Sequence, residues 1–90
     1  MVSTKRWSVD IYVDVDGDGH TYAEARLHTG ADTMLVGVGR ARLNPSDRDI
    51  PEIGDELATA RALNDLGHRL LLTTAGDIEA ITHERAHLTG

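Results

Sequence analysis

The sequence predicts a small α+β domain in which a three-stranded antiparallel meander is followed by a long helix and a short C-terminal helix. Three observations support this fold class. Apolar and polar residues alternate over residues 6–14, an Asp-Gly turn follows at 16–19, and apolar residues recur at helical spacing over 52–72. The chain has 90 residues, which suits a single domain spanning 1–90.

The first two strands are predicted by period-two alternation. Trp7, Val9, Ile11 and Val13 alternate with polar residues, so we expect residues 6–14 to form a strand with one buried face. After the turn, residues 20–28 show the same alternation and form the second strand of a hairpin.

The third strand, residues 34–43, carries two glycines. Gly37 and Gly39 share one side of it with small or apolar residues, and Arg40 and Arg42 lie on the other side. Glycine inside a strand often marks a close approach of backbone. We therefore expect the small side to face a helix, with the arginines on the opposite face of the sheet.

The helical pattern begins after Pro51 and predicts a helix over residues 52–72. Its expected buried stripe consists of Ile53, Leu57, Ala60, Leu63, Leu66 and Leu70. Thr73, Thr74 and Gly76 interrupt the pattern, which predicts a second, short helix over 77–83. Both helices are expected on one side of the sheet.

Composition limits the core and the environment. The chain has one Trp, two Tyr and no Phe, so its core must be aliphatic, and a second copy covering one face would compensate; this predicts a homodimer. There is no cysteine, no signal-peptide pattern and no apolar run long enough to cross a membrane, which favours the cytoplasm. The net charge of −6 disfavours non-specific binding to nucleic acid.

The segment His83-Glu84-Arg85-Ala86-His87 matches the H-E-x-x-H pattern of zinc peptidases. Three residues follow it, so no third ligand lies downstream, and a domain of this size has little room for a substrate groove. We interpret the match as chance and expect no resident metal, although weak metal binding by His83 and His87 stays open.

Two further motifs have a structural interpretation. The run Asp14–Gly19 resembles the first half of a calcium loop, but Ala25 stands where the bidentate Glu belongs, so a hairpin turn is favoured. Whether this turn also binds a metal stays open. In Gly37-Val38-Gly39 the glycines lie within a strand, whereas a dinucleotide site needs them after it. No nucleophilic constellation is present, so we expect neither an enzyme nor a cofactor or small-molecule substrate.

A cluster of arginines is the remaining candidate. Arg26, Arg40 and Arg42 fall on one face of adjacent strands, and Lys5 and Arg6 enter nearby. Such a cluster could hold RNA phosphates, with Tyr22 available for stacking on a base. The alternative is a solvated sheet face or a dimer interface in which the arginines pair with Glu24 and Asp10. On the helix, Arg61 and Arg69 are each expected to pair with Asp65.

Four segments resemble a family of short actinobacterial proteins of unknown function with a double-stranded-RNA-binding-domain-like (dsRBD-like) fold. They are residues 7–11 (WSVDI), 36–45 (VGVGRARLNP), 50–67 (IPEIGDELATARALNDLG) and 77–83 (DIEAITH). The family is linked to dormancy and low-oxygen stress, and its dimers are likened to ribosome hibernation-promoting factors. The resemblance implies a homodimer and a role with stalled ribosomes, and it transfers no site residues.

Two functions are therefore expected. The first is a non-enzymatic stress protein that contacts the ribosome or RNA through Arg26, Arg40 and Arg42, because residues 52–66 hold four acidic residues against Arg61 alone. The second is an acidic homodimeric protein-interaction module without nucleic-acid contact. The sequence leaves the physiological partner and any exchange of elements between subunits undetermined.

Overall fold

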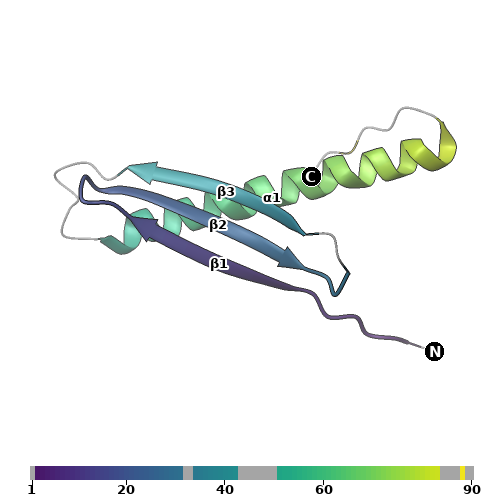
Figure 1. The fold of residues 1–90 in the computed structure, drawn as a ribbon, viewed down its shortest axis with the longest axis horizontal. Coiled ribbons are helices and arrows are strands. Elements are labelled where there is room, and N and C mark those ends of the chain that lie inside the picture. The colour runs from purple at the N-terminus through teal and green to yellow at the C-terminus, as the bar shows by residue number, and fades with distance from the viewer. Residues whose placement is uncertain (1, 32–33, 43–50, 84–87, 89–90) are drawn as a thin grey trace.

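The structure, a computed structural model, describes residues 2–31, 34–42, 51–83 and 88. It contains strands β1 (Ser8–Val15), β2 (His20–His28) and β3 (Leu35–Arg42), followed by helix α1 (Pro51–Thr82). The strands form one antiparallel sheet in the order β1-β2-β3, and α1 crosses one face of it (Figure 1). The predicted α+β class and the three-stranded meander are confirmed.

The strand alternation sets the two faces of the sheet. Along β2, alternate residues from Thr21 to Leu27 are buried under the helix, whereas those between them are more exposed. The β1–β2 turn is closed by Asp16, whose Oδ1 accepts the backbone N–H groups of Asp18 at 2.8 Å and His20 at 3.0 Å. Gly19 takes a positive φ of 79°, which glycine adopts without strain. The hairpin prediction is confirmed.

The helix touches the sheet backbone directly at two glycines of β3. A Cβ atom at Gly37 would overlap the backbone of Ala62 and Leu66, and one at Gly39 would overlap the backbone of Ala58 and Ala62. The small side of β3 therefore faces the helix, as predicted. The surrounding core is made of Ala23, Ala25, Leu27, Ala41, Ala58, Ala62 and Leu66.

The predicted buried stripe of the helix is confirmed for Leu66 and, in part, for Leu70, and it is wrong for the other four residues. Ile53, Leu57 and Leu63 are 45%, 40% and 45% exposed, and Ala60 is also exposed. The helix instead buries the line Gly54, Ala58, Ala62 and Leu66, which recurs every four residues. A sheet surface of glycine and alanine allows the closest approach when the helix presents small side chains, so Ala58 and Ala62 are buried there and Leu57 and Leu63 are not.

The expected buried face of β1 is also absent. Every residue of β1 is exposed, and Val9, Ile11 and Val13 remain 39%, 37% and 38% accessible. Close packing on β3 holds α1 over β3 and β2, so the helix scarcely reaches β1. The prediction of a strand is confirmed, and the prediction that one of its faces is buried is wrong.

The prediction of two helices is wrong, because α1 continues without a break to Thr82. The hydroxyls of Thr73 and Thr74 donate to the carbonyls of Arg69 and Leu70 one turn earlier, at 3.0 and 2.9 Å, so both threonines fit within the helix. At about 1.5 Å per residue α1 is about 48 Å long and extends beyond the sheet (Figure 1). No helix among the described residues is long and apolar enough to cross a membrane.

Two helix side chains form hydrogen bonds with backbone groups on the outer edge of β3. Asp65 Oδ2 accepts the backbone N–H of Val38 at 2.8 Å, and Arg61 Nη1 donates to the carbonyl of Arg40 at 2.7 Å. Arg69 pairs with Asp65 at 2.9 Å, as predicted. Arg61 was also predicted to pair with Asp65, but it donates to the carbonyl of Arg40 on β3 instead. The hydrogen bond from Val38, followed by that from Arg69, lowers the pKa of Asp65.

We expect Gly39→Ala to lower the free energy of unfolding by about 3 kcal/mol, because its Cβ would meet helix backbone that cannot move aside. Gly67→Ala is the matched control. Nothing lies within 4 Å of a Cβ at Gly67, so this helical substitution should stabilise by about 0.5–1 kcal/mol. Chemical denaturation followed by circular dichroism measures both. A Gly39→Ala protein as stable as the wild type would contradict the backbone contact.

We expect Asp65→Ala to destabilise the fold at neutral pH by leaving the Val38 N–H unpaired. The folded-state pKa of Asp65 is lowered, so its contribution is present above the unfolded pKa and is lost as the pH falls through the folded value. The stability difference between wild type and variant should therefore shrink below about pH 4. Denaturation curves at several pH values test this, with exposed Asp77→Ala as control. A difference independent of pH would contradict the role of the carboxylate.

Candidate functional site

The face of the sheet turned away from α1 is a polar layer, which we call the outer face. It carries Asp10, Tyr12 and Asp14 from β1, His20, Tyr22, Glu24, Arg26 and His28 from β2, and Val36, Val38, Arg40 and Arg42 from β3. The three arginines expected to form a site all lie on this face. Their surroundings differ.

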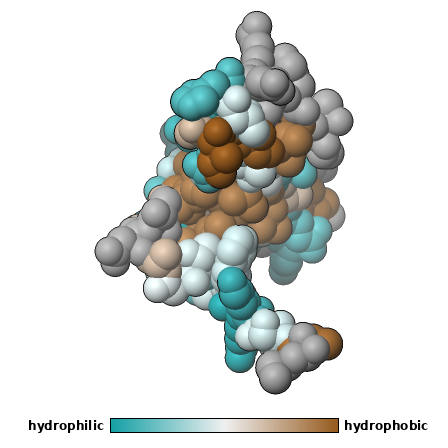
Figure 2. All heavy atoms as spheres, turned by 90° about the vertical axis from the view of Figure 1, so that its right-hand side faces the viewer, coloured by the Kyte–Doolittle hydropathy of each residue, from teal (hydrophilic) through white to brown (hydrophobic). Residues whose placement is uncertain are grey.

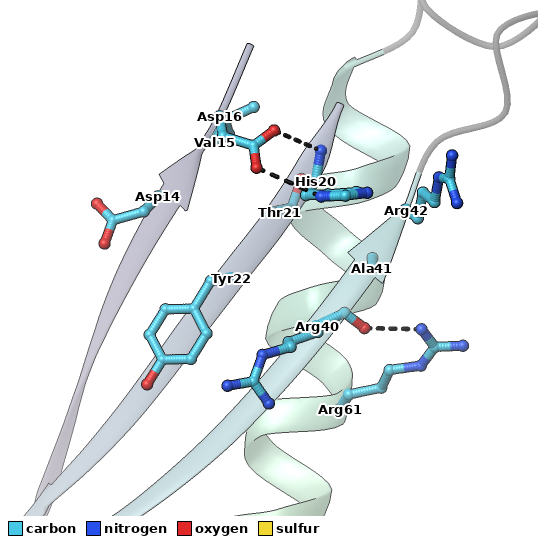
Figure 3. Close-up of a pocket in the computed structure, with 10 residues that line it drawn as sticks. All are labelled: Asp14, Val15, Asp16, His20, Thr21, Tyr22, Arg40, Ala41, Arg42 and Arg61. Carbon is cyan, nitrogen blue, oxygen red and sulfur yellow. Dashed lines mark hydrogen bonds and ion pairs between the residues drawn. The ribbon is translucent and has the colours of Figure 1, made fainter. Parts of the chain in front are cut away.

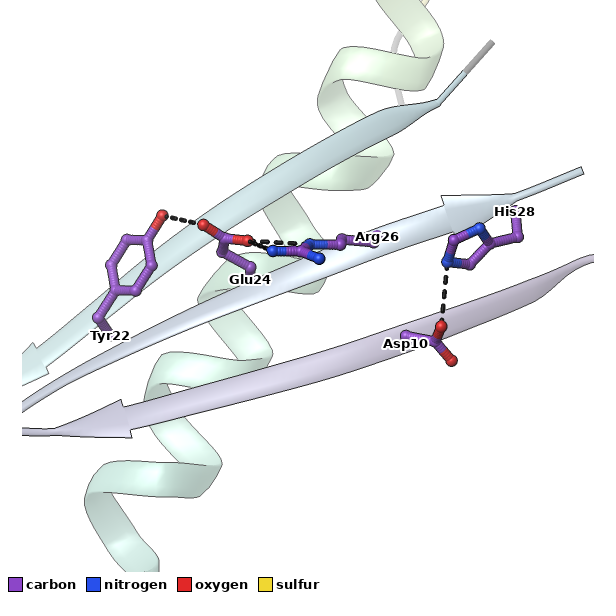
Figure 4. Close-up of polar contacts among 5 residues, drawn as sticks. All are labelled: Asp10, Tyr22, Glu24, Arg26 and His28. Carbon is purple, nitrogen blue, oxygen red and sulfur yellow. Dashed lines mark hydrogen bonds and ion pairs between the residues drawn. The ribbon is translucent and has the colours of Figure 1, made fainter. Parts of the chain in front are cut away.

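Arg26 is held in a compact polar cluster (Figure 4). Its Nε and Nη2 donate to Glu24 Oε2 at 3.0 and 2.8 Å, and its guanidinium lies 4.2 Å from the centre of the Tyr12 ring. Tyr22 Oη donates to the other oxygen of Glu24 at 2.9 Å. The Arg26 hydrogen bond, followed by that of Tyr22, lowers the pKa of Glu24. The charge of Arg26 is therefore compensated.

Among the described residues, Asp10 pairs with a histidine and not with an arginine. Its carboxylate lies 3.0 Å from Nε2 of His28 across the β1–β2 pair (Figure 4). The predicted pairing of an arginine with Glu24 is confirmed, and the predicted pairing of an arginine with Asp10 is wrong among the described residues.

Arg26 on β2 lies beside the start of β3, whereas Arg40 and Arg42 lie at the end of β3. Arg26 is opposite Val36, so Arg40 is four residues further along, about 13 Å away by strand rise. The Arg40 guanidinium lies 5.2 Å from the centre of the Tyr22 ring. Among the described residues, Arg42 has no ion-pair partner. Within the part of the chain that the structure describes, the predicted cluster is thus divided into Arg26, which has an acidic partner, and Arg40 and Arg42, which have none.

A hollow of about 650 Å³ lies at this end of the sheet, and we call it the arginine hollow (Figure 3). Arg40 and Arg42 line it from β3, and Arg61 reaches it from α1 around the strand edge. The other lining residues are Asp14, Val15, Asp16, His20, Thr21, Tyr22 and Ala41. Arg61 was missed as a site residue because its contact joins positions 21 apart, which no local spacing indicates.

The N-terminal basic residues are not part of this hollow. Lys5 and Arg6 precede Ser8, which pairs with His28, whereas Arg42 pairs with His20 at the opposite end of β2. The expectation that Lys5 and Arg6 enter near all three arginines is therefore wrong for Arg40 and Arg42.

In the β1–β2 turn, the carboxylate of Asp16 is bonded within the turn itself. The N–H groups of His20 and Asp18 hold Asp16 and lower its pKa, and His20 Nδ1 lies 3.4 Å from the same carboxylate. Within the described part of the chain, no three acidic or histidine side chains are placed together to hold a metal. This arrangement is that of a hairpin turn.

The H-E-x-x-H segment does not begin inside the helix. Helix α1 ends at Thr82, and His83 takes a left-handed φ of 59° while its N–H bonds to the carbonyl of Glu79. Residues 84–87 lie outside the described residues. His83 therefore lies outside α1, and the possible metal binding by His83 and His87 stays untested.

A second surface is apolar and lies on the helix side of the sheet. It consists of Trp7, Val9, Ile11, Val13 and Val15, and we call it the β1 apolar strip. All five residues are more than a third exposed. Hydrophobic side chains also gather in the end-on view of the molecule, below the end of the helix (Figure 2). Contiguous apolar surface of this kind marks an interaction site.

Comparison with known proteins places the chain in a family. The Rv2632c-like family matches residues 5–87. The chain is 56% identical over 84 residues to the uncharacterised protein Mb1767 of Mycobacterium bovis, covering 93% of this chain and 87% of that protein. It is 48% identical over 80 residues to the uncharacterised protein Rv2632c of Mycobacterium tuberculosis, covering 89% and 84%. The protein therefore belongs to the Rv2632c-like family.

Proposed function

We propose that this protein is a non-enzymatic, homodimeric binding protein with a dsRBD-like fold, which contacts the ribosome in the cytoplasm during stress or dormancy. The observation that carries the proposal is the contrast between its two surfaces. The β1 apolar strip leaves apolar side chains exposed, whereas the outer face is polar and carries Arg40 and Arg42, which have no acidic partner among the described residues. The first surface suits a second copy, and the second suits an RNA partner.

The two edges of the sheet support dimerisation through β1. On β3, Asp65 and Arg61 occupy an N–H and a carbonyl group that would otherwise pair with another strand. On β1, residues Ser8–Val15 contain no proline or lysine, the residues that commonly protect an edge strand. An open edge beside an apolar strip is a template for another strand.

A second copy fits this edge. Antiparallel pairing of two β1 strands about Ile11 places Val9 opposite Val13 and Asp10 opposite Tyr12, so no two carboxylates face each other directly. The pairing also brings two apolar strips together on one side of the new sheet. For a chain whose core is mainly alanine, this burial supplies apolar area that the single copy lacks.

The arginine side of the outer face supports contact with RNA. Arg26 is compensated by Glu24, so Arg40 and Arg42 are the residues of the predicted set that offer charge to phosphate. Glu52 and Glu56 on the exposed part of α1 repel phosphate, which favours approach from the sheet side. Ribosomal RNA is the partner suggested by the family resemblance.

An acidic protein-interaction module is the second candidate. The charges of the outer face support it, because Asp10, Asp14 and Glu24 balance Arg26, Arg40 and Arg42. Such a face suits a protein partner of mixed charge as well as RNA. The two candidates share the dimer and differ in their response to salt and to loss of Arg40 and Arg42.

We expect Ile11→Lys to convert a dimer into a monomer, because a charged group in the β1 apolar strip opposes its burial by a second copy. The side chain is 37% exposed in the single copy, so the lysine can reach water without disturbing the fold. Light scattering after gel filtration measures the mass, against 9.8 kDa for one chain. Val36→Lys, on the outer face, is the control and should remain dimeric. A wild-type protein that is monomeric at high concentration would refute the dimer.

We expect the wild type to co-sediment with ribosomal particles at low salt and to dissociate as salt rises, since phosphate contacts release counterions. The double variant Arg40→Ala/Arg42→Ala should remain at the top of the gradient. Arg69→Ala, which removes an arginine already paired with Asp65, is the matched control and should behave as the wild type. Wild type left at the top in every salt would favour the interaction module, and a double variant that still sediments would reject this face.

A further inference from the structure

We propose that the arginine hollow binds the phosphate group of a nucleotide, either free or within an RNA strand. The inference rests on the proposed function and deepens it, because it assigns a ligand to the end of the sheet where Arg40 and Arg42 lie. It also adds Arg61, a residue of the helix, to the two arginines of β3.

The cations of the hollow come from two elements that a single hydrogen bond joins. Arg61 Nη1 donates to the carbonyl of Arg40, which fixes the guanidinium at the strand edge. Only one of its five N–H donors is used by this bond, so the others remain for a ligand. Arg42 has no ion-pair partner among the described residues. A single guanidinium group can donate two parallel N–H bonds to a phosphate, so each of these arginines can bind one.

The two carboxylates of the hollow do not cancel these charges. Asp16 is committed to the β1–β2 turn, where it accepts two backbone N–H groups and faces His20. Asp14 extends from β1 on the opposite side of Tyr22 from Arg42 (Figure 3). Its place suits hydrogen-bond donors of a ligand, such as ribose hydroxyls, while the phosphate lies at the arginines.

The hollow also provides a planar group and enough space for a nucleotide. Arg40 stacks over Tyr22 at 5.2 Å, and RNA-binding proteins stack exposed bases on aromatic rings and on guanidinium planes. Its volume of about 650 Å³ falls within the range of pockets for small ligands, about 300–1,000 Å³. Inorganic phosphate alone would fill a small part of it.

The test is an NMR titration of the full chain with adenosine 5′-monophosphate, adenosine, inorganic phosphate and a short single-stranded RNA. We expect the monophosphate or the RNA to shift the amide signals of Thr21, Ala41 and Arg42, and adenosine to bind at least about tenfold more weakly. Binding of the monophosphate indicates a free nucleotide, and binding of RNA alone indicates a strand.

Two substitutions assign the binding to the hollow. Arg42→Gln removes a charge whose side chain has no ion pair among the described residues, so the fold should persist while affinity falls about tenfold. Arg61→Lys keeps the charge and should weaken binding less. Arg69→Gln, eight positions further along the same helix, is the matched control and should leave affinity unchanged. Arg42→Gln with wild-type affinity, or equal binding of adenosine and its monophosphate, overturns the proposal.

The failure of this proposal is distinguishable from that of the proposed function. A wild type that binds the monophosphate at Arg42 but stays at the top of a ribosome gradient overturns the ribosome contact alone. A wild type that sediments with ribosomes without binding the monophosphate or the RNA in the titration overturns the hollow alone.

Discussion

The contact between the β3 backbone and the α1 backbone at Gly37 and Gly39 determines most of this structure. Because no side chain stands between strand and helix there, the two elements approach until their main chains touch. The partners on the helix must then be small, which explains Ala58 and Ala62 at the centre of the core. The glycines that weaken β3 as an isolated strand are what bring the helix onto the sheet.

The same contact makes the protein asymmetric. With α1 packed on β3, the side chains of Asp65 and Arg61 reach the outer edge of that strand, where they bond the N–H of Val38 and the carbonyl of Arg40. On the other side, β1 lies beyond the width of one helix and keeps its apolar side chains exposed. The helix therefore bonds to one edge of the sheet and leaves the other uncovered, and its position accounts for both the Arg61 contact in the arginine hollow and the exposed β1 apolar strip.

Local patterns in the sequence predicted the parts of the fold that depend on local physics. Period-two alternation determined the strands, and the glycines of β3 correctly indicated the face that meets the helix. The helix was misjudged because apolar spacing favours Leu57 and Leu63, whereas the glycine surface selects the smallest residues. The pattern at Thr73 and Thr74 predicts an end to the helix. In the structure each hydroxyl instead donates a hydrogen bond to a carbonyl one turn earlier, so the helix continues. The site was predicted in part. Arg26 and Glu24 are two residues apart on one strand, so their pairing follows from the alternation, whereas the hydrogen bond from Arg61 to Arg40 joins residues 21 positions apart.

An alanine core has a thermal consequence. Alanine loses no rotamer entropy on burial, and it also contributes little apolar area, so the heat capacity of unfolding of a single copy is small for its length. A small heat-capacity change gives a broad, shallow dependence of stability on temperature. A partner that buried the exposed apolar side chains of β1 would increase this heat-capacity change, and calorimetry would detect such a partner as a more strongly curved dependence of stability on temperature.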